Sequence, residues 1–228
     1  DFMGKPLFDR KSQAMMLNAD GQALLTAIEP ALDAMADAVD EWAGQGGEYR
    51  LRLGVLPLFG SQRLIPKLPE LRKLFPKLHI DVDTSAHAEN LLGDVVDAAI
   101  IIADQVDPRL YAVRLDRNNV YAIASETAAR EQSLKKPADL TNQTVLVHSD
   151  MPLIFDAWRV AVGEPKLKPA AIDHIDSGPL MLEAAANGLG VAIMHGSHFS
   201  DAKDPRLVRL FDFEVGSPCS YWLVSRTR

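Results

Sequence analysis

Two short motifs hold residue types that could carry out catalysis or bind a metal. His148, Ser149 and Asp150 are the residue types of a hydrolase triad, but adjacent residues cannot line up as nucleophile, base and orienting carboxylate. His195 and His198 form an HxxH pair with no CxxC or carboxylate motif beside it, which is typical of structural or surface histidine. The sequence therefore predicts neither an enzyme nor a metal site.

Two other features could suggest a cofactor or redox chemistry. NGLGVAIM contains a GxG step, but a helix is expected to enter Gly188 and a strand to leave it, the reverse of a phosphate-binding fingerprint. Gly188 is instead predicted to follow the end of a helix. Cys219 is the only cysteine, so it has no resolving partner within the chain and is expected to be a small, partly buried side chain. No cofactor is predicted.

The composition indicates a globular protein with room for more than one lobe. The chain has 228 residues, of which 47% are hydrophobic and 24% charged, enough to bury a sizeable core. No apolar run approaches the roughly 18 residues of a membrane span. A single cysteine fits a reducing compartment, so a cytoplasmic protein is expected, with no membrane partner.

The net charge of −7 is unevenly distributed. Residues 1–18 carry Lys5, Arg10 and Lys11 against two acids, whereas residues 19–49 hold seven acids and no Lys or Arg. The rest of the chain is nearly balanced. Only the first 18 residues could therefore contact nucleic acid phosphates.

Residues 19–47 are predicted to form one long helix. Asn18 is a favourable N-cap, and Asp20 stands in the first turn, where an acidic side chain stabilises the start of a helix. The helix is expected to end at the glycines Gly44, Gly46 and Gly47.

The apolar residues of this helix recur at spacings of three and four residues, the a/d pattern of a coiled coil. They are Leu25, Ile28, Leu32, Met35, Val39 and Trp42. Pro30 lies on the opposite side, where a bend leaves the seam open. A solitary helix of this kind needs a partner in water. Dimerisation is the favoured interpretation, and packing on the chain's own domain is the alternative.

After the glycines, strands and helices alternate along the chain. Strands are predicted at 51–56, 78–84, 97–102, 110–116, 119–125, 144–147, 171–176, 191–194 and in two segments near the end. Helices are predicted at 61–75, 88–94, around Trp158 and at 178–187. This order predicts an α/β fold with a largely parallel sheet covered on both faces.

Two predicted strand-to-helix junctions, residues 56–62 and 176–179, present backbone N–H groups at a helix start. Ser61 and Ser177 are small donors there, and Thr84 and Ser85 end the strand beside the first junction. Each serine could be an N-cap instead of a ligand contact. Together these residues predict a cleft for a small polar or anionic molecule.

At this point the chain resembles the LysR-type transcriptional regulators. MGKPLFDR (3–10) and LNADG (17–21) are similar to the end of that family's DNA-binding domain, with Asn18 at a usual Thr position. The segments LRLGVLPLFGSQRLIPKLPELRKLFPKLHIDV, LLGDVVDAAI, LKKPADL and AAANGLGVAIM are similar to its effector-binding domain in order and spacing. DAWRVAVG and HSD are similar to the branch of glycine-cleavage activators and β-lactamase regulators.

The resemblance implies two Rossmann-like lobes, as in type II periplasmic binding proteins, preceded by a long dimerisation helix. Crossover strands are expected near 117–123 and 220–226. The implied regions are the end of a winged helix-turn-helix domain (1–18), a linker helix (19–47), lobe I (48–118 and 220–228) and lobe II (119–219). On this view most of the DNA-binding domain and a C-terminal helix are expected to lie outside the chain.

The resemblance also implies the site and the partners. The implied effector contacts are Pro57, Leu58, Phe59, Gly60, Ser61, Gln62, Thr84, Ser85, His148, Asp176, Ser177 and His195, and Arg10 and Lys11 would contact DNA phosphates. The expected partners are double-stranded DNA, a carboxylate or amino-acid-like effector, a second or further copies in a homodimer or homotetramer, and RNA polymerase.

Two departures from the family pattern affect the effector site. Leu58 stands where the family often has Ser or Thr, and Ile101 stands where it often has Arg. Both changes make the wall of the first lobe less polar, which weakens the case for an anionic effector. An extracytoplasmic solute-binding protein with the same two-lobe scaffold is the alternative function. The coiled-coil seam and the basic N-terminal stretch argue against it.

Overall fold

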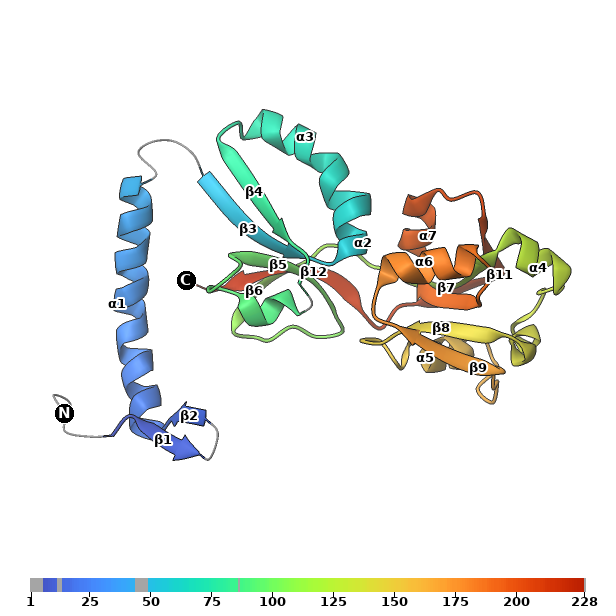
Figure 1. Cartoon of the computed structure of the whole chain (residues 1–228), viewed down its shortest axis with the longest axis horizontal. Helices are drawn as coiled ribbons and strands as arrows, with labels where there is room; N and C mark the ends of the chain where they lie inside the picture. Colours follow the sequence, from blue (N-terminus) through green and yellow to red (C-terminus); the bar gives the residue numbers. More distant parts are fainter. Residues whose placement is uncertain (1–5, 12–13, 44–48, 86, 228) are drawn as a thin grey trace. The chain divides into compact units, whose positions relative to one another are not determined.

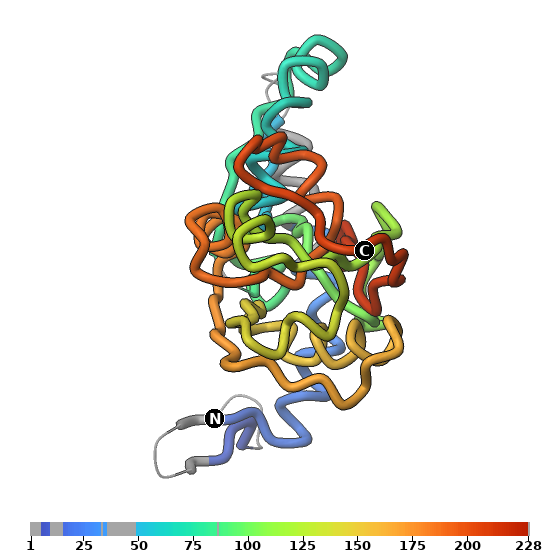
Figure 2. Tube along the Cα trace, turned by 90° about the vertical axis from the view of Figure 1, so that its right-hand side faces the viewer, coloured from blue at the N-terminus to red at the C-terminus, as the bar shows by residue number. Residues whose placement is uncertain are grey.

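The computed structural model describes residues 6–11, 14–43, 49–85 and 87–227. The chain divides into two compact units, Asp1–Tyr49 and Arg50–Arg228. The path of the chain can be followed by colour from the N-terminus to the C-terminus in two views (Figures 1 and 2). Among the described residues, no helix is both long and apolar enough to cross a membrane.

The N-terminal unit consists of a hairpin and one long helix. Strands β1 (Phe8–Lys11) and β2 (Ala14–Leu17) pair antiparallel, and α1 spans Ala19–Ala43. Asn18 confirms its predicted role as N-cap, because its Oδ1 accepts a hydrogen bond from the Gly21 amide at 2.9 Å. Its backbone N–H also donates to the Leu7 carbonyl at 3.0 Å, which ties the start of the helix to the hairpin.

Helix α1 contains Asp20 in its first turn and Pro30 in its interior, as predicted. The seam residues with described side chains are exposed in the single chain: Leu25, Ile28, Leu32 and Met35. Several N-terminal predictions fall outside the described residues: the glycines at 44, 46 and 47, and the side chains of Arg10, Lys11, Val39 and Trp42.

The second unit contains two five-stranded sheets. The first sheet has the order β4-β3-β5-β12-β6. Its strands are β3 Tyr49–Val55, β4 Leu78–Asp83, β5 Ala98–Ala103, β6 Leu110–Arg114 and β12 Ser220–Arg226. The second sheet has the order β11-β7-β10-β8-β9. Its strands are β7 Asn119–Ser125, β8 Thr144–His148, β9 Ala171–Ile175, β10 Val191–His195 and β11 Leu207–Gly216.

The sheets are mixed, so the expectation of largely parallel sheets was wrong. β3 and β5 pair parallel, as do β8 with β9 and with β10. β7 and β12 each follow a strand of the other sheet and run antiparallel to both of their neighbours. A strand that enters from the opposite sheet arrives in the reverse direction, and the alternation of strands and helices along the sequence does not reveal this.

Helices and helical turns connect the strands of the second unit. They are α2 Pro57–Phe59, the π-helical turn η2 Gly60–Leu64, α3 Ile65–Leu74, η3 Ala88–Leu91, α4 Glu126–Glu131, η4 Pro137–Asn142, α5 Ile154–Ala161, α6 Gly178–Ala186 and α7 Gly196–Ala202. The helix expected at 61–75 therefore begins at Pro57, and α4 and α7 were not predicted. Proline is favourable at the first position of a helix, where its missing N–H has no partner to lose.

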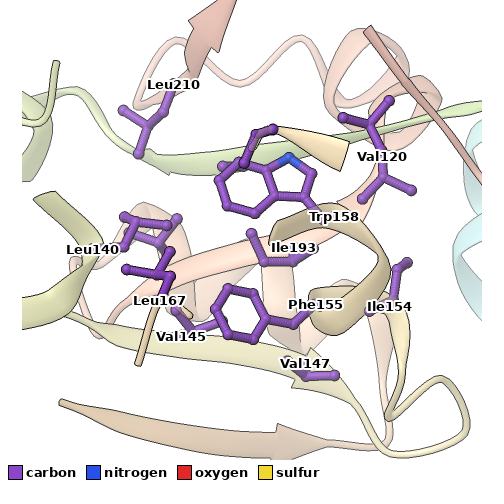
Figure 3. Close-up of a cluster of buried hydrophobic side chains, with 14 of the residues drawn as sticks. Val120, Leu140, Val145, Val147, Ile154, Phe155, Trp158, Leu167, Ile193 and Leu210 are labelled. Atoms are coloured by element: carbon purple, nitrogen blue, oxygen red, sulfur yellow. The ribbon is translucent and has the colours of Figure 1, made fainter. Parts of the chain in front are cut away.

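Alternate residues of each strand point to opposite sides of the second sheet. Apolar side chains cover both of its faces. On one face, Trp158 and Phe155 of α5 pack on Val145, Val147 and other apolar strand residues (Figure 3). On the other face, α6 contributes Met181, Leu182 and Ala185 to a second cluster with Ile123, Leu146 and Ala192. The first sheet likewise has an apolar cluster on each face.

Candidate functional site

A cavity of about 320 Å³ lies where the carboxyl ends of strands from both sheets meet. From the first sheet, the wall includes the residues after β3 and β4. From the second sheet, it includes the residues at the ends of β8, β9 and β10. In an open α/β sheet, ligands bind at this edge. The mixed topology thus brings residues nearly 140 positions apart, such as Leu56 and Met194, into one wall.

Eight of the twelve residues expected to contact an effector line this cavity: Pro57, Leu58, Thr84, Ser85, His148, Asp176, Ser177 and His195. The other four lie behind the wall. Phe59 packs on Tyr221 with ring centroids 4.8 Å apart. Gly60 faces Val55, where an added Cβ would come within 3.3 Å of a methyl group. Ser61 donates to the Leu58 carbonyl at 3.2 Å.

The two serines expected at helix starts have different roles. Ser61 is inside η2, since the helical segment begins at Pro57 after the N-cap Leu56. Ser177 does occupy the N-cap position of α6, but its side chain makes no capping hydrogen bond. Its hydroxyl therefore remains available to a molecule in the cavity.

Fifteen further residues line the cavity in addition to the predicted effector contacts. They are Leu56, His87, Ala88, Glu89, Ile100, Ile101, Ile102, Asp150, Met151, Gly178, Pro179, Met181, Met194, His198 and Tyr221. Leu56, Gly178 and Pro179 lie within the predicted junctions, and Ile101 was expected in the wall of the first lobe. Asp150 and Met151 could have been found by extending the strand end at His148 by two or three residues. Tyr221 could not, because it belongs to the strand that returns from the second sheet and carries no local signal.

His198 is a buried residue of the cavity wall and belongs to a chain of hydrogen bonds. Its Nδ1 lies 3.1 Å from Oε1 of Gln62, whose Nε2 donates to the His198 carbonyl at 3.2 Å. Because an amide oxygen only accepts, Nδ1 carries the proton and Nε2 accepts from the Tyr221 hydroxyl at 2.8 Å. This arrangement satisfies a neutral imidazole completely.

His195 is equally buried but only half satisfied. Its Nε2 lies 2.6 Å from the Ser217 hydroxyl, which also accepts from the Cys219 amide at 3.1 Å. Its Nδ1 is buried and has no partner among the described residues. The rings of His195 and His198 stack with centroids 6.1 Å apart.

Burial keeps both histidines neutral at physiological pH. Desolvation is the largest cause and lowers the pKa of His195 to about 4 and that of His198 to about 3. Nearby Arg63 lowers both further, and Asp116 partly opposes the change at His195. Burial also raises the pKa of the Tyr221 hydroxyl, which keeps it protonated as a donor.

The two sheets are joined behind the cavity by apolar packing and by ion pairs. Leu58, which follows a first-sheet strand, is buried in the cluster that covers the second sheet. A Cβ on Gly178 would come within 2.9 Å of the Leu58 side chain, so the starts of α2 and α6 approach closely here. Arg63 pairs with Asp201 of α7 at 2.7 Å and with Asp116 at 3.0 Å.

The candidate metal ligands do not gather into a site. No group of three or more His, Cys, Asp or Glu side chains among the described residues could hold a metal ion. The Cys219 thiol is half-buried, and burial raises its pKa, which makes it a weaker nucleophile. The cavity has the concave, partly apolar lining with a few polar groups that is typical of a ligand-binding pocket.

Comparison with known proteins assigns the chain to a family. The sequence profile of the LysR substrate binding domain matches residues 44–228. The chain is 30% identical to the HTH-type transcriptional activator AmpR of Enterobacter cloacae over 95% of this chain and 74% of the relative. It is 24% identical to the glycine cleavage system transcriptional activator of Escherichia coli strain K12 over 98% of this chain and 74% of the relative.

Two solved structures share both fold and sequence similarity with this chain. The effector domain of AmpR from Pseudomonas aeruginosa superposes with a TM-score of 0.64 at 27% identity, over 78% of this chain and 85% of that one. The AmpR effector binding domain from Citrobacter freundii superposes with a TM-score of 0.67 at 26% identity, over 78% and 88%. The chain belongs to the LysR-type transcriptional regulators, and residues 44–228 are its LysR substrate binding domain.

Proposed function

We propose that this regulator binds a small-molecule effector in the cavity between its two sheets and responds by changing how the two lobes are arranged. The observation that carries this proposal is the convergence of strand ends from both sheets on one cavity. A ligand that contacts both walls binds one arrangement of the lobes more tightly than another, and it shifts the population by that difference.

The proposed effector contacts are the eight predicted residues that line the cavity, together with Glu89, Asp150, His198 and Tyr221. We assign a supporting role to Phe59, Gly60, Ser61 and Gln62, because they fix the helix that carries the wall. Lobe I would comprise 48–118 and 220–228, and lobe II 119–219. The chain passes between the sheets just before Asn119 and again just before Ser220.

Helix α1 is proposed as the dimerisation element. Leu32 and Met35 of its seam are 55% and 66% exposed in the single chain, which is costly unless another surface covers them. The hairpin β1–β2 would be the wing of a DNA-binding domain, with Arg10 and Lys11 contacting phosphates. Binding to double-stranded DNA, assembly as a dimer or tetramer, contact with RNA polymerase and a cytoplasmic location belong to this proposal.

Of the two candidate functions, a transcriptional regulator is supported and a solute-binding protein is not. Both curated relatives named above are transcriptional activators. The same relatives argue against an enzyme, as does the absence of a catalytic constellation among the residues described at the cavity.

A thermal-shift screen of metabolites against residues 1–228 tests the proposal. An effector raises the melting temperature, since binding to the folded state stabilises it by mass action. Ser177→Trp fills the cavity and should abolish this rise. Leu180→Trp is the matched control, because Leu180 lies on the same helix, is 60% exposed and does not line the cavity. If every stabilising metabolite acts equally on the Ser177 variant, the cavity is not the effector site.

A further inference from the structure

The charged groups that line the cavity are all acidic. Glu89, Asp150 and Asp176 are part of the wall, and no Lys or Arg is found among its described residues. Arg63, whose charge lowers the pKa of the wall residues His195 and His198, does not line the cavity itself. It is paired with Asp116 and Asp201. A carboxylate ligand would therefore enter a pocket of like charge with no cation to receive it.

The three carboxylates come from both walls. Asp150 and Asp176 follow the neighbouring parallel strands β8 and β9, where His148 lies opposite Ile175. The Ser149 amide donates to the Ile175 carbonyl at 3.1 Å, which holds these two strand ends together. Glu89 belongs to η3 of the first sheet's lobe. A group placed between the walls is thus close to negative charge on both sides.

Partners within the protein leave these carboxylates largely uncompensated. The Asp176 side chain makes no hydrogen bond or ion pair with any of the described residues. Among the described residues, the charged partners of the Asp150 and Glu89 side chains are histidines, at 3.9 Å to His148 and 3.6 Å to His87. His148 Nδ1 accepts from the Asp150 amide at 3.2 Å, so the proton of the neutral ring is on Nε2.

The starts of α2 and α6 would favour an anion, but both are weakened. A helix start carries about half a positive charge, which is less than one carboxylate. Each of these helices has a proline in its first two positions, which removes one of the N–H groups that would otherwise bind an anion. The sum of the wall's charges therefore stays negative.

Part of the remaining wall is apolar, and one of its buried polar groups is unsatisfied. Leu56, Ile101, Met181 and Met194 contribute aliphatic surface. His195 lines the cavity, is 1% exposed, and its Nδ1 has no partner among the described residues. A buried ring nitrogen of this kind is normally hydrogen-bonded, so a ligand that supplies a donor or acceptor there would complete it.

We propose that the cavity selects a ligand that carries a protonated amine, held by Asp150, Asp176 and Glu89, on an apolar body that packs against the aliphatic wall. This inference rests on the proposed function, because it names the chemical class of effector that the same cavity takes. It favours the amine over the carboxylate among the groups that an amino-acid-like effector could present.

A matched trio of probes tests the charge preference: benzylammonium, benzyl alcohol and benzoate, titrated at pH 7 and low salt and followed by ligand-observed NMR. The three share an aromatic body and differ in the charge of the head group. Benzylammonium should bind at least about tenfold more tightly than benzoate, because attraction and repulsion by the same carboxylates act in opposite directions. The preference should weaken as salt is added.

Variants place the effect on the cavity. Asp150→Asn combined with Asp176→Asn should reduce benzylammonium affinity about fivefold or more and leave benzyl alcohol affinity unchanged. Asp173→Asn is the control, since Asp173 is exposed on β9 and does not line the cavity. Tighter binding of benzoate than of benzylammonium, or no binding by any of the three, would overturn the proposal. If Ser177→Trp leaves binding unchanged, the cavity assignment itself is wrong, and the proposed function fails with it.

Discussion

At the scale of single residues, the buried histidines of the cavity wall are the most informative feature. The sequence favoured a structural or surface role for His195 and His198 over a role as metal ligands. In the structure each is at most 5% exposed, and their ring nitrogens bond Ser217, Gln62 and Tyr221, so both support the cavity wall that they line. Because Tyr221 lies on a strand that returns from the other sheet, no local pattern could have predicted this network.

The same histidines should make stability depend on pH. Their pKa values are about 4 and about 3 in the folded chain, below the 6.5 of an unperturbed histidine. Between these values the unfolded state binds more protons, so the free energy of unfolding falls as the pH drops below about 6.5. Each histidine should contribute up to about 1.4 kcal/mol per pH unit. Urea unfolding at pH 7.5 and 5.5 measures the effect.

Matched variants assign this pH dependence to particular residues. His198→Gln should remove part of the loss between pH 7.5 and 5.5. The exposed His174 provides the control, and His174→Gln should leave the pH dependence as in the unmodified chain. An equal pH dependence in the His198 variant would show that its imidazole is not held neutral by burial.

At the scale of elements, the segment from Pro57 to Leu64 joins the two lobes. It follows a first-sheet strand, yet Leu58 is buried with residues of the second sheet, and Arg63 pairs with Asp201 of α7. This explains a leucine where the family often has Ser or Thr: at this position the side chain packs between lobes. The helix was predicted to start at Ser61, four residues after its observed start at Pro57. Serine is a common N-cap residue and proline is common at N1, so both positions are compatible with a helix start.

Removing the charge of Arg63 should loosen this junction. Arg63→Met leaves Asp116 and Asp201 without their partner, and since all three side chains are partly exposed we expect a loss of about 1–2 kcal/mol in the free energy of unfolding. Lys67→Met, which removes an exposed pair with Glu70, should change it by less than about 0.5 kcal/mol. Chemical denaturation of both variants provides the comparison. Similar losses in the two would contradict a joining role for Arg63.

The elements that the sequence predicted best are those with strong local periodicity. The strand at 119–125 and the start of the helix after Asn18 were placed correctly. The direction of strand pairing was not predicted correctly. β7 and β12 pair with strands that are distant in the sequence, as in the pairing of Ser220 with Ala103, and local patterns do not reveal such pairing. Eight of the twelve predicted contacts line the cavity, on both walls, because strand ends can be recognised locally. The four that do not, Phe59 to Gln62, lie inside the helical segment whose start at Pro57 was placed too late.

At the scale of the whole molecule, the exposed seam of α1 predicts self-association. Sedimentation of residues 1–228 at micromolar concentration should show a dimer or a tetramer. Leu32→Lys places a charge in the seam and should weaken the association at least about tenfold, as expected for a charge in the core of a coiled coil. Ala23→Lys, on the side of the helix away from the seam, should have no effect. A monomeric unmodified chain would contradict the dimerisation role.

Regulation by an effector links these scales. In this proposal the residues of the wall would recognise the ligand, the segment 57–64 joins the lobes that the ligand would contact, and α1 would pass a change to the partner chain. The direct test is a crystal structure of residues 1–228 with the most stabilising metabolite from the thermal-shift screen. The account predicts ligand density in the cavity, in contact with Thr84, His148 and Ser177. Density elsewhere on the chain, with the cavity free of ligand, would contradict it.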